Sequence, residues 1–322
     1  MGFSADALIY TAPGEVQVNR VPLDPAGALV RTRFSGISRG TERLIFNGLV
    51  PPGEYQRMRA PLQVGDFPFP VRYGYAAVGT VEAGPEDLLG RQVFCLHPHQ
   101  TLFRADPGML VPLPDDVPPE RAILAANAET ALNAIWDADV HPGCRCLIVG
   151  AGLLGWLIAA LLSRRSDLSP RITDIRPETG VKADDFSVRF LKPDAVERQA
   201  YDVIFHTSAS AGGLQTAIDA ACFEGRVIEL SWYGDRPVCV ELGGNFHANR
   251  VSIISSQVGS VARRRRASHR YRDRLEQAIA ALSDPRLDAL ITEEVQFFDL
   301  PDALPRLLAP DAPGIATRVV YP

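Results

Sequence analysis

A glycine-rich turn between a short apolar strand and a long apolar helix constrains this chain most. We predict the strand over Arg145–Val149 and the helix over Trp156–Arg165. In such a turn one glycine permits the tight reversal, a second lets a pyrophosphate approach the backbone, and a third lets helix and strand pack closely. The helix amides then face the anion. A purely structural turn is the alternative, but the context favours dinucleotide binding. The predicted contacts are Gly150, Gly152, Leu153, Leu154 and Gly155.

Strands and helices continue to alternate after this turn. Such alternation predicts an α/β fold with a doubly wound parallel sheet, a Rossmann domain. The polar segment Glu178–Arg198 is poorly patterned, so one helix of this fold is expected to be short or missing. The predicted strands are Arg171–Thr173, Asp202–His206, Arg226–Ser231 and Val251–Ser256, and the predicted helices are Gly212–Cys222 and Tyr271–Leu282.

An acidic residue follows the second strand of this pattern. Asp174 lies 19 residues beyond Gly155, where a carboxylate accepts hydrogen bonds from the adenosine ribose and favours NAD. Two residues later, Arg176 could instead bind a 2′-phosphate and favour NADP. The other interpretation of Arg176 is a solvated loop residue. We therefore expect NAD as the cofactor, with NADP as the alternative.

The first third of the chain differs from this region. Short apolar runs there alternate with Pro and Gly, which predicts an antiparallel β domain. A single helix is predicted over Glu120–Asp137, and the tail Ile291–Pro322 returns to short β-like pieces that rejoin the first domain. The expected domains are residues 1–119, completed by 287–322, and residues 120–286.

Composition fits an ordinary two-domain globular protein. The 322 residues carry a net charge of −5, with 46% hydrophobic and 22% charged residues. This balance favours neither a nucleic-acid nor a membrane partner. No apolar stretch reaches the ~18 residues of a spanning helix, and residues 1–12 lack the features of a signal peptide. We expect a cytoplasmic protein with a small-molecule substrate.

Two segments resemble signatures of the medium-chain dehydrogenase/reductase superfamily. They are residues 35–42, Ser-Gly-Ile-Ser-Arg-Gly-Thr-Glu, and residues 74–81, Gly-Tyr-Ala-Ala-Val-Gly-Thr-Val. The glycine turn follows in the proper order, so the resemblance covers essentially the whole chain. It implies an alcohol dehydrogenase-like enzyme with a GroES-like catalytic domain, a Rossmann domain and a return to the first domain. The chain looks most similar to the zinc-free, bacteriochlorophyllide dehydrogenase-like branch, which oxidises a hydroxyethyl group on a tetrapyrrole.

Departures from the zinc-dependent members concern the metal. In those members the first signature carries a metal-binding Cys, and the second carries a His-Glu pair. Here these positions hold Ser38 and Tyr75 with Ala76, and Ala126 stands at a further ligand position, so no useful zinc ligand set remains. The structural zinc lobe is also missing, because Val93–Val111 contains a single cysteine. We expect no metal, and we interpret His97 and His99 as ordinary surface loop residues.

Without zinc, the charge on the substrate oxygen needs hydrogen-bond donors or a proton relay. Ser38, Thr41 and Tyr75 occupy or adjoin the vacated ligand positions and are the candidate catalytic residues, with Glu42 as an orienting base. The alternative is that the hydroxyls bond the loop backbone, while Glu42 pairs with Arg39 or Arg43.

Segments that follow the parallel strands are expected to surround the cofactor, since ligands bind beyond the carboxyl ends of such strands. For the aromatic residues among them, packing between domains is the alternative. Predicted cofactor contacts are Ser208, Ser231, Ser256, Val258 and Thr130, and the predicted substrate pocket contains Asn127, Trp232 and Tyr233.

One charge cluster stands out, Arg263–Arg266 with His269, Arg270, Arg272 and Arg274. We interpret it first as a solvated helix start, and alternatively as an anchor for an acidic, bulky or phosphorylated substrate. The main functional hypothesis is a zinc-independent NAD(P)-dependent alcohol dehydrogenase or ketoreductase. A zinc-free NADPH quinone or enoyl reductase and a cofactor-binding protein without turnover are the alternatives. The superfamily leads us to expect a homodimer.

Overall fold

The computed structural model describes residues 4–322, which form two compact units. Unit 1 comprises Met1–Ala126 and Ile291–Pro322, and unit 2 comprises Asn127–Leu290. The first boundary lies later than the one expected at residue 119, because the predicted single helix is two helices, α2 (Pro119–Ala122) and α3 (Ala125–Ala138). The first of these packs against strands β3 and β6 of unit 1.

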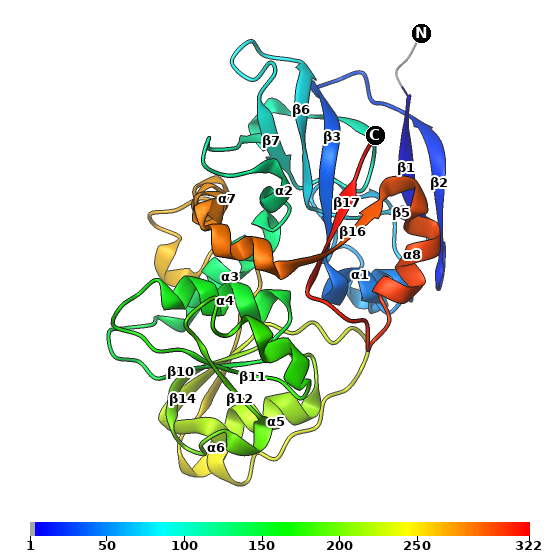
Figure 1. Ribbon diagram of the computed structural model, residues 1–322. Coiled ribbons are helices and arrows are strands. Elements are labelled where there is room, and N and C mark those ends of the chain that lie inside the picture. Colours follow the sequence, from blue (N-terminus) through cyan, green and yellow to red (C-terminus); the bar gives the residue numbers. More distant parts are fainter. Residues whose placement is uncertain (1–3) are drawn as a thin grey trace. The chain divides into compact units, whose positions relative to one another are not determined.

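Unit 2 is built on a six-stranded sheet in the order β12-β11-β10-β13-β14-β15, with all neighbouring strands parallel (Figure 1). The doubly wound sheet predicted from the sequence is therefore confirmed. The strands are β10 (Cys146–Val149), β11 (Arg171–Thr173), β12 (Arg189–Leu191), β13 (Tyr201–His206), β14 (Ala221–Glu229) and β15 (Ser252–Ser255). The helices that follow α3 are α4 (Leu153–Ser163), α5 (Ala211–Ala220), α6 (Asn245–Ala248) and α7 (Tyr271–Ala280).

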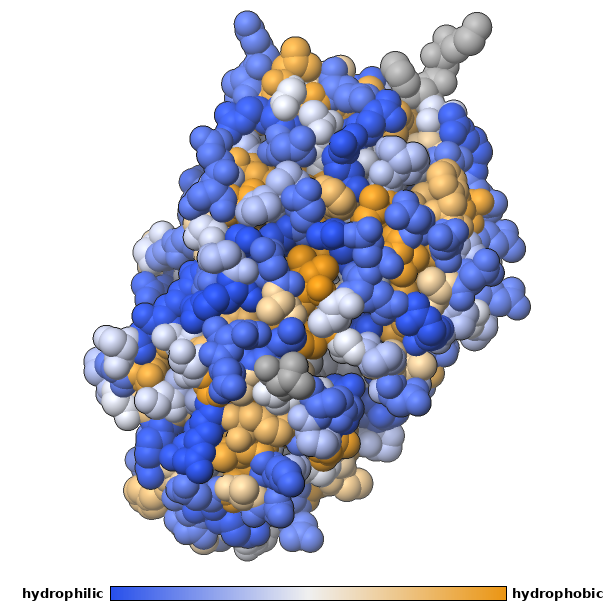
Figure 2. All heavy atoms as spheres, in the orientation of Figure 1, coloured by the Kyte–Doolittle hydropathy of each residue, from blue (hydrophilic) through white to orange (hydrophobic). Residues whose placement is uncertain are grey.

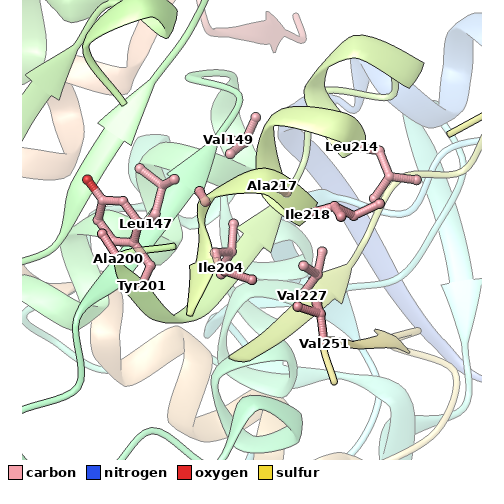
Figure 3. Packing of buried hydrophobic residues seen from close by; sticks show 12 residues of the cluster. Leu147, Val149, Ala200, Tyr201, Ile204, Leu214, Ala217, Ile218, Val227 and Val251 are labelled. Carbon is pink, nitrogen blue, oxygen red and sulfur yellow. The ribbon is translucent and has the colours of Figure 1, made fainter. Parts of the chain in front are cut away.

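The core of unit 2 follows from these patterns. Every residue of β10 is buried, as expected for a parallel strand covered on both faces. Helix α5 presents Leu214, Ala217 and Ile218 at helical spacing, and Figure 3 shows these side chains with those of the sheet. Between β11 and β12 the chain forms only a 3₁₀ turn, Pro177–Lys182, in place of a full helix.

Unit 1 contains a seven-stranded sheet, with main order β16-β17-β3-β6-β7-β9 and β8 paired to β3, and a four-stranded sheet in the order β2-β1-β5-β4. Except for β16 with β17, the paired strands are antiparallel, as predicted. The strands are β1 (Ser4–Ala12), β2 (Glu15–Pro22), β3 (Ala28–Ile37), β4 (Val64–Gly65), β5 (Val71–Arg72), β6 (Ala77–Ala83), β7 (Gln92–Cys95), β8 (Leu102–Ala105), β9 (Val111–Pro112), β16 (Ile291–Gln296) and β17 (Ala316–Val320). The remaining helices are α1 (Arg39–Phe46) and α8 (Leu300–Leu307).

The C-terminal tail is not made only of β-like pieces, because α8 lies between β16 and β17. This helix buries Leu300, Leu304 and Leu307, whose spacing places them on one face. Strand β17 pairs antiparallel with β3, so the tail is part of the main sheet of unit 1.

The surface visible in Figure 2 is mainly hydrophilic, with apolar residues scattered in small groups. Among the residues that the structure describes, no helix has both the length and the apolar character needed to cross a bilayer.

Candidate functional site

The glycine turn joins the end of β10 to the start of α4. Gly150 has φ +112°, which favours glycine, and a Cβ there would lie 2.7 Å from Thr207 Oγ1. A Cβ on Gly155 would lie 1.9 Å from the Gly150 carbonyl oxygen, whereas a Cβ on Gly152 would meet nothing within 4 Å. Gly150 and Gly155 therefore serve the packing of the turn. Gly152 caps α4 at an open surface, next to the first helix amides, which have no intrahelical partner.

Asp174 lies against the same turn, directly after β11. One carboxylate oxygen accepts a hydrogen bond from the Ala151 amide at 2.8 Å, and the other accepts one from the Arg176 amide at 2.9 Å. The Arg176 side chain reaches the second oxygen at 3.3 Å while remaining 36% exposed. The structure thus brings both predicted specificity residues to the glycine turn.

A polar cluster that sequence analysis missed lies beyond β13 and β14. His206 is fully buried, and its Nδ1 lies 2.7 Å from Glu229 Oε2. Its Nε2 lies 2.7 Å from Ser208 Oγ, and the Ser231 amide donates to Glu229 Oε1 at 2.7 Å. The signal available in the sequence was a histidine at the end of one predicted strand and a glutamate near the end of the next. The predicted contacts Ser208 and Ser231 belong to this cluster.

The other predicted residues of unit 2 are less concentrated. Ser256 is buried and donates to Asp137 at 2.7 Å. Trp232 and Tyr233 are both half-buried, and the Tyr233 hydroxyl donates to Glu229 at 3.1 Å. Asn127 and Thr130 lie half-buried on α3, and the predicted contact Val258 lies half-buried after β15.

The arginine cluster divides into two parts. Arg263–Arg266 is exposed, which agrees with a solvated segment. Arg274, however, is 1% exposed and does not belong to a solvent-facing cluster. It bonds Glu129 at 2.9 Å and Asn133 at 2.6 Å, and it also donates to the Val258 carbonyl. The guanidinium therefore ties α7 to α3 and to the segment after β15, because its fork carries several donors.

In unit 1, Tyr75 is half-buried, and the side chains of Ser38 and Thr41 lie close enough to its phenol to influence the pKa of that group. Burial raises the pKa of Tyr75 to about 12, although the neighbouring hydroxyls of Ser38 and Thr41 act in the opposite direction. The phenol therefore stays protonated near neutral pH and is available as a donor. The structure brings three of the four predicted catalytic residues close together.

Glu42, the fourth, is fully buried on α1 and accepts three hydrogen bonds. The donors are the Ser38 amide at 2.8 Å, the Tyr10 hydroxyl at 2.8 Å and His99 Nε2 at 3.1 Å. Arg39 and Arg43 instead donate to backbone carbonyls of the C-terminal tail, so the alternative in which one of them pairs with Glu42 is wrong.

His99 is 1% exposed and His97 is 8% exposed, so the interpretation of both as surface loop residues is also wrong. His99 Nδ1 lies 2.7 Å from Ser35 Oγ, which lies 2.9 Å from the Tyr321 hydroxyl. Residues distant in sequence thus form one buried polar chain with Glu42. Sequence analysis missed this chain because its members come from separate strands and loops.

The donor set around Tyr75 does not fit the zinc site of the fold family. A hydroxyl, a phenol and the methyl group of Ala76 replace the thiolate, imidazole and carboxylate that hold zinc. Within residues 4–322, no group of three His, Cys, Asp or Glu side chains is arranged to hold a metal.

Comparison with known proteins places these features in context. No family model matches the chain. The chain is similar to 2-desacetyl-2-hydroxyethyl bacteriochlorophyllide A dehydrogenase of Cereibacter sphaeroides, with 27% identity over 257 residues, 70% of this chain and 74% of the relative.

Two solved structures share the fold over 99% of this chain, each at 14% identity. The first, described as a short chain alcohol dehydrogenase of Escherichia coli CFT073 complexed with NADH, has a TM-score of 0.78 and is covered over 100% of its length. The second, a dehydrogenase of Sinorhizobium meliloti 1021 classed as zinc-binding and bound to NADP, has a TM-score of 0.79 and is covered over 99%. The predicted combination of a Rossmann domain with a GroES-like domain is confirmed.

Proposed function

Because the chain is an NAD(P)-dependent oxidoreductase of the medium-chain dehydrogenase/reductase superfamily, we propose that it interconverts an alcohol and a carbonyl compound without a catalytic metal. The observation that carries this proposal is that Tyr75 lies close to Ser38 and Thr41, at or beside the positions where zinc-dependent members carry their metal ligands. The named activity of the bacterial relative suggests a secondary alcohol, in the form of a hydroxyethyl group, as the substrate class.

A bound nicotinamide cofactor would supply the hydride-transfer chemistry. The open face of the glycine turn would hold its pyrophosphate, and Asp174 would accept hydrogen bonds from its adenosine ribose. Tyr75 donates its phenolic proton in a hydrogen bond to the substrate oxygen and so stabilises the developing negative charge. Ser38 and Thr41 hold the phenol in position, and Glu42 fixes the start of α1 by accepting the Ser38 amide.

Replacing Tyr75 by phenylalanine tests this role. We expect the kcat for acetophenone reduction with NADH to fall about 10²-fold, because one donor to the developing oxyanion is lost. The affinity for NADH should stay unchanged. Tyr55→Phe is the matched control, since Tyr55 lies in unit 1 and its ring packs on Phe67, 5.9 Å away.

Product analysis separates this reaction from its alternatives. With benzalacetone as the probe, an alcohol dehydrogenase forms the unsaturated alcohol, whereas an enoyl reductase forms the saturated ketone. Loss of the double bond would favour the enoyl reductase, and firm NADH binding without any turnover would favour a cofactor-binding protein. Full activity of the Tyr75→Phe variant would remove the proposed role of the phenol.

We expect the purified protein to hold no stoichiometric zinc, because Ser38, Tyr75 and Ala76 cannot supply its usual ligands. Elemental analysis of the protein after dialysis without chelator checks this expectation. About one tightly held zinc ion per chain would overturn it, while traces that a brief chelator wash removes would agree with it.

Asp174 should make the protein prefer NADH over NADPH, since its carboxylate would bond the ribose hydroxyls and repel a 2′-phosphate. Titration of the wild type and of Asp174→Ala with both reduced cofactors measures this preference. The Asp174→Ala substitution should reduce the preference for NADH over NADPH. Arg176→Ala serves as the companion variant, because Arg176 contacts the carboxylate of Asp174. If the wild type binds NADPH more tightly than NADH, or if Asp174→Ala leaves the cofactor preference unchanged, another residue determines that preference.

A further inference from the structure

The strand order of unit 2 assigns the two halves of a dinucleotide to opposite sides of β10. The pyrophosphate belongs at the glycine turn after β10, and the adenosine ribose belongs beside Asp174, after the neighbouring strand β11. Strands β13 and β14 lie on the other side of β10. If the protein binds a nicotinamide dinucleotide as proposed above, its nicotinamide half extends over the ends of these two strands.

The last residues of β13 and β14 form a buried, hydrogen-bonded pair at that place. The Glu229 side chain is 14% exposed and that of His206 is fully buried. Burial acts to raise the pKa of Glu229, but hydrogen bonds from His206 and Ser231 outweigh it, so the pKa is lowered and the group is a carboxylate at neutral pH. A carboxylate only accepts hydrogen bonds, and here it receives three, with the Tyr233 hydroxyl as the third donor.

His206 extends this arrangement to the other loop. Nδ1 of His206 donates to Glu229, and Nε2 on the other side of the ring lies 2.7 Å from Ser208 Oγ. Ser208 Oγ lies 2.9 Å from Ser210 Oγ. Ser210 Oγ in turn caps α5, because it accepts a hydrogen bond from the Gly213 amide. A Cβ on Gly213 would lie 2.1 Å from Ser208 Oγ, so the glycine makes room for this chain of hydrogen bonds.

We propose that Glu229 is a positioning residue that sets the loops after β13 and β14 for the nicotinamide half of the cofactor. It fixes one loop through Ser231 and Tyr233, and the other through His206 and Ser208. The two loops are also joined directly, because the Ala209 amide donates to Ser231 Oγ at 3.0 Å. Removing the carboxylate leaves buried donors without an acceptor, which loosens both loops together.

The test compares Glu229→Gln with the wild type in two titrations. Glutamine keeps the shape of the side chain but turns an amide N–H₂ group towards the existing donors. We expect the Kd for NADH to rise about tenfold, in line with the loss of one hydrogen bond to a charged group. The Kd for adenosine monophosphate should stay unchanged, because this fragment contacts the adenosine side alone.

Glu224→Gln is the matched control, since Glu224 lies on the same strand and its side chain is 59% exposed. Glu229→Asp should restore part of the NADH affinity by keeping the charge. Tyr233→Phe, which removes only the half-buried donor, should weaken NADH binding less and leave the nucleotide fragment unaffected. This variant tests the proposal if Glu229→Gln fails to fold.

The outcomes are distinguishable from those of the proposed function. If the wild type binds adenosine monophosphate but not NADH, the proposed function fails. If the wild type binds NADH and Glu229→Gln binds it equally well, the positioning role fails alone. If Glu229→Gln loses affinity for NADH and for adenosine monophosphate to the same extent, the positioning role is also overturned, because such a result would indicate general destabilisation of unit 2.

Discussion

Gly152→Val should abolish NADH binding while leaving the protein folded. A valine side chain would occupy the place where the pyrophosphate approaches the backbone. The folded chain itself has room, because a Cβ at this position meets nothing within 4 Å. We expect the Kd for NADH to rise at least about 10²-fold, which corresponds to roughly 2.7 kcal/mol. NADH fluorescence titration measures the affinity, and a thermal melt measures the fold.

The matched control is Gly243→Val, since a Cβ on Gly243 in the same unit also meets nothing within 4 Å. It should change neither the affinity nor the melting temperature. An unchanged Kd for NADH in Gly152→Val would contradict the dinucleotide site at this turn. A lower melting temperature without loss of affinity would instead assign Gly152 a structural role.

Arg274→Met should lower the free energy of unfolding by about 3–5 kcal/mol, the usual effect of breaking a buried ion pair. The substitution leaves the Glu129 carboxylate buried without its cation and removes the donor to the Val258 carbonyl. Burial already acts to raise the pKa of Glu129, and Arg274 is the group that opposes it. Urea unfolding at neutral pH measures the change.

Two further variants make this test specific. Arg272→Met, on the same helix, removes an exposed pair with Glu276 and should cost at most about 1 kcal/mol. Replacing both partners, with Arg274→Met and Glu129→Leu, should recover much of the loss, because no unpaired charge remains buried. If Arg274→Met lowers the free energy of unfolding as little as Arg272→Met does, the buried ion pair contributes little to stability.

The parts of the fold that the sequence predicted are those with local signals. The glycine turn and the apolar runs of β10, β11 and β13 depend on residues close in sequence, so their pattern identifies them. The helix break near Ile123 and helix α8 were not predicted. The helix break depends on packing of α2 within unit 1. The leucines of α8, by contrast, recur at helical spacing, a local signal that the sequence analysis overlooked.

Contacts between buried polar groups are still harder to predict from the sequence, because the partners are far apart along the chain. A sequence does not tell whether His99 faces solvent or Glu42, because the two residues meet only after β-sheet formation. Arg274 stands in an arginine-rich segment whose composition indicates solvent exposure, yet its fork reaches a carboxylate 145 positions earlier in the chain. By contrast, Ser38, Thr41 and Tyr75 could be grouped as candidates from the sequence, because they lie at or beside the ligand positions of two signatures. Their catalytic role stays a prediction.

The place of β17 in unit 1 has a consequence for synthesis on the ribosome. Unit 2 is one continuous stretch and has all its strands once Leu290 has emerged. The edge of β3 that pairs with Ala316–Val320 must wait until these residues have emerged. Until then an unpaired strand edge is exposed to other nascent chains, and Ser35 lacks the Tyr321 hydroxyl. Chaperones that shield strand edges should therefore affect the yield of this protein through unit 1.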